Sequence, residues 1–429
     1  MLQTIKNAWK IEDLRKKILF TLFIVVLYRI GSVIPVPFIS TELMNSMSDA
    51  TQGSLFAYFN ILSGEAFTRA TLFALSISPY ITSSIVIQLL TIAIPALERL
   101  SKEGEAGRKK LTQITRYATV ALALVTSIGY YTFIKYNNWL MPGADTAFHA
   151  AVIIASYCAG AAIIMWLAEK INENGIGNGI SIILFANIAA SLPGMLYTAF
   201  ENAKLNPTLG ILIPVITVAL LVVMIFFIVY VTNAERRLPV QYAKRQVGRR
   251  MYGGQNTFLP MKLNMSGVMP IIFASSIAAI PTTIALIFPP KTDSVWSKIV
   301  GWFSSTSPIY MVIYFLLIIG FAYFYLAISF NPIEVANNLK NNGGFIPGIR
   351  PGKPTTDYIS KILGRITLIG AIFLGIVATL PLVIGVIQPS LAGLAFGGSS
   401  LLILVSVALE TVKEMEAQMT MRHYKGFLE

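Results

Sequence analysis

The sequence has few charged residues, one cysteine and two histidines. Of its 429 residues, 12% are charged and 55% are hydrophobic, and its mean hydropathy is +0.68. This composition excludes an ordinary soluble enzyme and is typical of a polytopic membrane protein. Because Cys158 is alone, no disulfide framework is possible within the chain. His149 and His423 lie far apart with no acidic cluster nearby, so we expect no metal site.

Long apolar runs take up most of the chain. Each is close to the roughly 20 residues that a helix needs to cross a bilayer. We expect ten spans at 18–35, 71–95, 116–135, 149–168, 180–199, 210–231, 267–288, 308–330, 365–385 and 392–411. No small-residue cleavage site follows the first run, so it is interpreted as a retained span. Residues 1–17 place Leu2, Ile5 and Trp9 at helical spacing among lysines, which predicts an amphipathic helix at the interface.

The basic residues are distributed unevenly between the loops. Lysine and arginine number 27 on the side that carries both termini and 5 on the other side. The positive-inside rule therefore places both termini in the cytoplasm. Two odd-numbered halves in series have opposite orientation, as in an inverted repeat around a central cavity. We expect an N-terminal half at 18–199, an external hinge loop at 200–209, a C-terminal half at 210–411 and a cytoplasmic tail at 412–429.

Charge is missing from the interior of the spans. Arg29 is the one candidate, and it lies near the external end of the first run. A snorkelling or structural role for Arg29 is favoured over a proton relay. The scarcity of intramembrane charge argues against an ion-driven carrier and against a charged selectivity ring. No nucleophile–base arrangement or carboxylate pair lies in a span, so we expect neither an enzyme nor a bound cofactor.

An apolar stretch of unusual length follows the first span. Residues 54–67 are about half as long as a spanning helix, and Gly64 interrupts them. Glu65 and Arg69 come next, four residues apart, before the full-length run that begins at Thr71. Backbone that stops at membrane depth must be shielded by protein or must face a water-filled cavity. We interpret 54–67 as a half-helix that stops a pore from the external side.

Two cytoplasmic loops are too long to be simple connectors. The loop 232–266 is strongly basic and is broken by glycine and proline, which predicts a hairpin. In the loop 331–363, Asn331 is a good N-cap before a short helix that ends at Gly343. Arg350 then stands in a Gly/Pro-rich turn, where it can pair with carboxylate or phosphate. For these two loops, docking of a partner is favoured over the alternative that their basic residues only set the orientation of the chain in the membrane.

Several long motifs resemble the SecY family, whose bacterial members are the channel subunits of the Sec protein translocase. The motifs include YRIGSVIPVP (28–37), KEGEAGRKKLTQITRY (102–117), GIGNGISIILFANI (175–188) and NPIEVANNLKNNGGFIPGIRPG (331–352). The resemblance extends over essentially the whole chain. It implies an all-α fold of ten transmembrane helices in two inverted five-helix halves around a central pore, with a half-helix plug.

The resemblance also implies roles for particular residues. It implies a pore ring of Ile77, Ile81, Leu184, Ile188, Ile272, Ile277 and Ile403, in which leucine replaces a frequent isoleucine at 184. It implies a plug that includes Phe56, Phe59, Asn60, Ile61 and Gly64. It implies a lateral gate of spans two, three, seven and eight, to which we assign the polar residues Ser84, Gln88, Thr126 and Ser275. It implies partner contacts at Arg249, Arg250 and Arg350.

The function implied is a protein-conducting channel of the bacterial plasma membrane. The expected partners are SecE, SecG, the motor ATPase SecA or the ribosome, nascent chains and phospholipid, with no specific DNA. Two other functions stay open at this point. One is a small-solute secondary transporter, against which the missing intramembrane charge counts. The other is a scaffold that recruits partners through its basic loops, against which the half-length stopper counts.

Overall fold

The computed structural model describes residues 2–40, 60, 63–204, 212–242, 245–247, 250–252, 256–265, 267–287, 294–304, 307–387 and 397–425. Every predicted span coincides with a helix or a broken helix. These are α2 (Glu12–Gly31), α6 (Ser78–Ala93), α8 (Glu105–Tyr136), α9 (Ala147–Asn174), α10 (Gly179–Lys204), α11 (Leu212–Asn233), α12 (Met269–Ala278) with α13 (Ile280–Ile287), α15 (Pro308–Ser329), α17 (Lys353–Ile387) and α19 (Gly397–Lys425).

Four described segments are long and apolar enough to cross a membrane by themselves. They are Glu105–Tyr136, Ala147–Asn174, Pro308–Asn341 and Lys353–Ile387. A fifth arises if α6 and α7 (Pro95–Lys102), which meet at a bend of 102°, count as one span. The other predicted spans are shorter, broken or carry charged ends, because the roughly 20 apolar residues of a span need not form one uniform helix.

The second span begins later than predicted. Residues 71–77 form turns, and the helix starts only at Ser78, with Pro79 in its first turn. Thr71 forms an isolated β-bridge with Pro35, and the amide of Leu72 donates to the carbonyl of Ile34 at 2.9 Å. These contacts use the backbone groups that a helix would need, and proline at a first helical turn is the favoured start.

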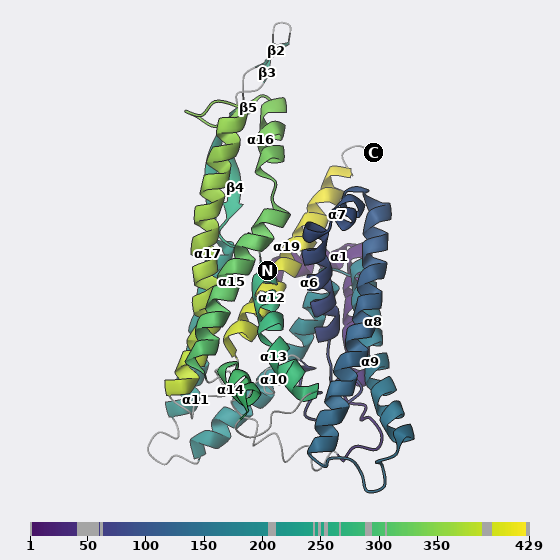
Figure 1. Ribbon diagram of the computed structural model, residues 1–429. Helices are drawn as coiled ribbons and strands as arrows, with labels where there is room; N and C mark the ends of the chain where they lie inside the picture. The colour runs from purple at the N-terminus through teal and green to yellow at the C-terminus, as the bar shows by residue number, and fades with distance from the viewer. Residues whose placement is uncertain are drawn as a thin grey trace.

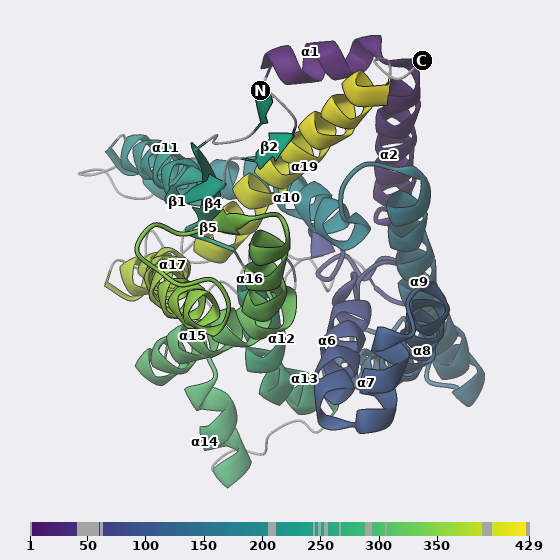
Figure 2. The ribbon, with the colours of Figure 1, turned by 90° about the horizontal axis from the view of Figure 1, so that it is seen from above.

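The N-terminal helix is also shorter than predicted. It is α1 (Leu2–Lys10), and the chain bends at Ile11 before α2 begins at Glu12. α1 lies across the end of α19 beside the start of α2 (Figure 2). The Thr4 hydroxyl donates to Glu416 Oε1 at 2.9 Å, and Ala8, Leu14 and Met415 share a small core. The two ends of the chain are therefore packed together.

The helices form two groups joined by one large core. α15, α16 (Pro332–Asn341) and α17 lie on one side, α6 to α9 on the other, and α19 runs obliquely between them (Figure 1). α14 (Val295–Trp302) lies at the end opposite the strands (Figure 1). The largest buried cluster draws Ile81 from one group, Phe373 from the other and Leu402 from α19. The groups therefore meet through apolar side chains.

All the strands among the described residues lie at one end of the molecule, beside α16 (Figure 1). β1 (Glu235–Tyr242) pairs antiparallel with β4 (Asn256–Lys262), with Leu238 opposite Leu259. β5 (Gly344–Phe345) pairs with the other edge of β1, and β2 (Arg245–Val247) pairs with β3 (Arg250–Tyr252). The hairpin predicted for 232–266 is confirmed, and its tip projects beyond the helices (Figure 1).

A two-point ion pair joins α8 to α9. Arg116 Nε and Nη2 each lie 2.8 Å from an oxygen of Glu169, whose exposed fraction is 8%. We expect Glu169→Gln to lower the free energy of unfolding in micelles by about 1–2 kcal/mol, because Arg116 is half exposed and water recovers part of the loss. Glu173→Gln, at the solvated Lys170–Glu173 pair, is the matched control and should leave unfolding unchanged. If the two changes lowered the free energy of unfolding equally, the Arg116–Glu169 pair would not be a special stabilising contact between α8 and α9.

Candidate functional site

Four of the seven predicted ring residues line one cavity. Ile81, Leu184, Ile272 and Ile403 come from α6, α10, α12 and α19, and they enclose part of a volume of about 390 Å³. Their exposed fractions are 5%, 1%, 4% and 2% in that order. Branched apolar side chains from four helices therefore converge on one cavity, and a narrow passage lined by them would wet poorly.

The other three ring residues do not line this cavity. Ile77 and Ile188 are buried in the same core, at 1% exposure each, but face elsewhere. Ile77 caps the start of α6. Ile277 is half-buried and lies outside that core. The ring assignment as a whole stays a prediction.

The cavity lies between two walls. α6 and α8 contribute Thr82, Val86, Leu122 and Thr126 to one wall. α12, α13 and the residue between them contribute Ile272, Ser275, Ser276, Ala279, Ile280, Thr283 and Ile284 to the other. Of the predicted gate residues, Thr126 and Ser275 line it, whereas Ser84 and Gln88 do not. The Gln88 amide donates to the Ser84 hydroxyl at 3.4 Å. The polar lining residues that the sequence analysis did not assign to the gate are Ser78, Thr82, Ser276 and Thr283.

The hydroxyl groups on the walls bond within their own helices. Thr126 donates to the carbonyl of Leu122 at 2.8 Å, and Ser275 and Ser276 donate to the carbonyl of Ile272 at 2.9 and 2.8 Å. Each of these hydrogen bonds, and that of Thr283 to the carbonyl of Ala279, stays within one wall. The walls therefore meet through apolar contact, and their separation would break few polar interactions.

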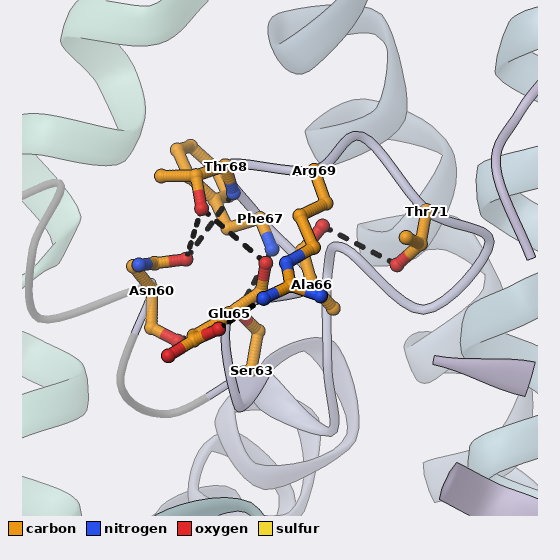
Figure 3. Close-up of polar contacts among 8 residues, drawn as sticks. All are labelled: Asn60, Ser63, Glu65, Ala66, Phe67, Thr68, Arg69 and Thr71. Carbon is orange, nitrogen blue, oxygen red and sulfur yellow. Dashed lines mark hydrogen bonds and ion pairs between the residues drawn. The ribbon is translucent and has the colours of Figure 1, made fainter. Parts of the chain in front are cut away.

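Residues 60 and 63–71, here named the plug base, fold into a compact polar turn (Figure 3). Asn60 Oδ1 accepts from the backbone amide of Thr68 at 3.2 Å and from its hydroxyl at 2.9 Å. The Glu65 amide donates to the Asn60 carbonyl at 2.8 Å, and Arg69 pairs with Glu65 at 2.6 Å. Positive φ at Gly64 and Glu65 allows this path. The helix predicted to reach Phe67 is therefore wrong over 64–67.

The plug base is attached to the N-terminal helices. The hydroxyl groups of Tyr130 on α8 and Tyr157 on α9 donate to the carbonyls of Phe67 and Ala70. The amide of Val36 also donates to Ala70, at 3.1 Å. Phe67 in turn lines the apolar cavity. This places the plug base directly against the cavity.

Of the five predicted plug residues, the structure describes only Asn60 and Gly64. Phe56, Phe59 and Ile61 lie outside the described residues. Asn60 and Gly64 are both part of the plug base. The polar role of Asn60 had no signal in hydrophobic patterning, although asparagine is a common turn residue because its side chain bonds nearby backbone.

The loops 232–266 and 331–363 form one platform. Leu238, Val240 and Met261 from the hairpin share a core with Leu339, Ile346 and Ile359 from the second loop and α17. Burial lowers the pKa of the Lys413 ammonium on α19, and the nearby charge of Lys262 on β4 lowers it further. The two loops are thus held as a unit.

Arg350 is displayed on this platform as predicted. The Asn331 side chain caps α16 by accepting from the amides of Ile333 and Glu334 at 3.2 and 3.4 Å. Gly348 and Gly352 both have positive φ, and the Thr355 hydroxyl donates to the Arg350 carbonyl at 2.9 Å. The Arg350 side chain is exposed. Arg250 begins β3, while Arg249 lies outside the described residues.

Comparisons with known proteins agree with this arrangement. The family model SecY matches residues 71–412. The protein translocase subunit SecY of Streptomyces scabiei is 44% identical over 444 residues, covering 100% of both chains.

Two solved structures are similar to the model. A structure whose plug domain is described as stabilising the closed state of the SecY translocation channel matches with a TM-score of 0.64 at 18% identity, covering 94% of this chain and 92% of that one. Sec61 in a canine ribosome–channel complex matches with a TM-score of 0.61 at 17% identity, with the same two coverages. With this fold, ten transmembrane helices and a plug, the chain belongs to the SecY family.

Proposed function

We propose that the chain is a passive channel through which unfolded proteins cross a membrane and from which transmembrane segments leave sideways into lipid. The observation that carries the proposal is the apolar cavity between α6/α8 and α12/α13, with Phe67 of the plug base against it. Apolar walls without specific hydrogen bonds accept many sequences, and a poorly wetted constriction holds back ions. The cavity suits the apolar helix of a signal sequence.

Family membership and chemistry both weigh against the alternatives. The SecY family is one of translocase subunits, which supports a channel rather than a small-solute transporter or an enzyme. The six ring and gate side chains that line the cavity are neutral, so none of them can couple transport to protons or sodium. The energy for movement must then come from a bound partner.

The partners follow from the platform and the family. We assign SecE and SecG as small partner subunits, and SecA or the ribosome as the source of force at the platform that displays Arg350. The canine neighbour is a ribosome–channel complex. The multi-pass chain would lie in the bacterial plasma membrane with both termini cytoplasmic, as the loop charges indicate. The N-terminal half at 18–199 and the C-terminal half at 210–411 would meet at the cavity.

A crosslinking scan tests the proposed path. The full chain is reconstituted with candidate partners, and a secretory precursor is stalled during transport. Photo-reactive groups at Ile81 and Ile272, on opposite walls of the cavity, should both crosslink to the precursor. A group at Tyr117, which is 77% exposed on α8, serves as the control and should not. Crosslinks equally strong at Tyr117 would count against a path through the cavity.

Charge reversal at Arg350 tests the platform. We expect Arg350→Glu to reduce ATP-driven export by roughly a hundredfold, because a displayed guanidinium that binds carboxylate or phosphate becomes a repelling group. Export into proteoliposomes and binding of the motor are measured together. Lys361→Glu, another exposed charge reversal nearby on α17, should leave both near the parent values. Normal export by Arg350→Glu would remove the docking role.

A further inference from the structure

Arg29 holds one nitrogen of its guanidinium in an unfavourable place. It lies in the last turn of α2 and is the only cation in a predicted span that is not that span's first or last residue. The side chain as a whole is half-buried, yet Nη1 is fully buried and has no hydrogen-bond partner among the described residues. A snorkelling arginine would keep these donors in water. Of the two roles expected from the sequence, snorkelling or structural, this buried nitrogen fits the structural one.

The plug base is what buries it. A Cβ atom added at Gly64 would lie 2.7 Å from Arg29 Nη1 and 3.1 Å from Asn187 Oδ1 on α10. Gly64 has a φ of +63°, which a glycine adopts without strain. The absence of a side chain lets the turn pack onto the guanidinium. The turn thus covers the nitrogen without accepting a hydrogen bond from it.

No acid in the plug base compensates the charge. Glu65 is the only acidic residue among residues 60 and 63–71, and its Oε2 is already 2.6 Å from Arg69 Nη2. Asn187 donates through Nδ2 to the hydroxyl of Ser76 at 3.3 Å, which fixes its amide beside the turn. The Asn187 amide thus makes one side of the surroundings of Nη1 polar. Among the described residues, no carboxylate pairs with this nitrogen.

The cost of this burial depends on the position of the plug base. Covering a cationic donor without an acceptor is unfavourable, and the penalty disappears when water returns. Arg29 is near the external end of its span, so departure of the Gly64 turn would let external water reach Nη1. We propose that Arg29 destabilises the seated plug base and so lowers the threshold for opening, a positioning role that rests on the proposed channel function.

The test is suppression in a leaky background. Asn60→Ala removes the two hydrogen bonds that Thr68 donates to Oδ1, so the resting channel should conduct measurably. Adding Arg29→Met keeps an unbranched side chain but deletes the charge. We expect the double variant to show a resting conductance about tenfold lower than Asn60→Ala alone in planar bilayers, which corresponds to about 1.4 kcal/mol. Simple structural damage would increase the leak.

Two further variants complete the test. Arg29→Lys keeps a cation at the site and should restore most of the leak. Lys135→Met, which removes an exposed external charge of the same half, should leave it unchanged. In the single variant Arg29→Met, export of a precursor with a weak signal sequence should slow, while export with a strong signal persists.

The outcomes separate this inference from the proposed function. An unchanged or larger leak in Asn60→Ala/Arg29→Met overturns the role of Arg29, because the side chain would then be neutral or would hold the plug in place. Absence of both conductance and export in the Asn60→Ala channel and in the parent would instead refute the channel function. A lower resting conductance in the double variant, together with retained export of a precursor with a strong signal, supports both the role of Arg29 and the channel function.

Discussion

Crosslinking α6 to α12 across the apolar cavity is expected to abolish protein transport. Thr82 and Ser276 line opposite walls of the cavity, and both are small enough to be replaced by cysteine. A short bifunctional reagent between Thr82→Cys and Ser276→Cys would hold the walls together. Because a translocating chain must pass between helices that meet through apolar contact, blocked separation leaves no room for it. Export into proteoliposomes is expected to fall at least a hundredfold.

The native cysteine and the length of the reagent provide the controls. Cys158 is half-buried on α9, so the pair is built in a Cys158→Ser background. Each single cysteine treated with the same reagent should export normally. A long flexible reagent on the pair should restore export, because it allows the walls to part. Full export with the short link in place would contradict the lateral cavity as the path.

The sequence predicted the spans because a membrane imposes a strict rule. Backbone polar groups in hydrocarbon must be satisfied internally, so each long apolar run had to be a helix or be shielded. Local sequence signals predicted the structure of the loop 331–363 equally well. Asn331 caps α16 as its position before Pro332 indicated, and the glycines around Arg350 adopt positive φ. These features depend on neighbouring residues alone.

Contacts between distant segments could not be predicted in the same way. The turns at 71–77 exist because Thr71 meets Pro35 and Leu72 bonds Ile34, and hydropathy contains no trace of either contact. The same limit explains why only some of the predicted ring residues line the cavity. Ile77 and Ile81 are both apolar and four residues apart, yet only Ile81 lines the cavity. Which face of an apolar helix meets a cavity depends on its packed neighbours.

The polar residues of the gate show a further limit. Thr126 and Ser275 were assigned to the lateral gate from the family resemblance, and each donates to a carbonyl of its own helix. A hydroxyl in an apolar helix always has such a carbonyl within reach, so its sequence does not reveal which partner it takes. The orphaned nitrogen of Arg29 was likewise invisible, because it depends on Gly64 lying opposite.

Asn60→Ala is expected to open the resting channel to ions. The single acceptor Oδ1 holds both the amide and the hydroxyl of Thr68, and so ties the start of the plug base to its end. Loss of this acceptor leaves the Thr68 amide unsatisfied and leaves its hydroxyl with only the longer bond to the Glu65 carbonyl at 3.3 Å. We expect a cost of about 1–3 kcal/mol. The population of the open state, measured as resting conductance in planar bilayers, should rise roughly tenfold to a hundredfold.

A graded series distinguishes loss of the acceptor from general damage. Asn60→Asp keeps an oxygen at the same position and should retain most of the seal. Thr68→Val removes the hydroxyl but keeps the amide, so its leak should lie between those of the parent and Asn60→Ala. The attachments of Tyr130 and Tyr157 to the carbonyls of Phe67 and Ala70 remain in every variant, so the plug base stays bound to α8 and α9. A leak in Asn60→Asp equal to that in Asn60→Ala would show that the acceptor does not hold the seal.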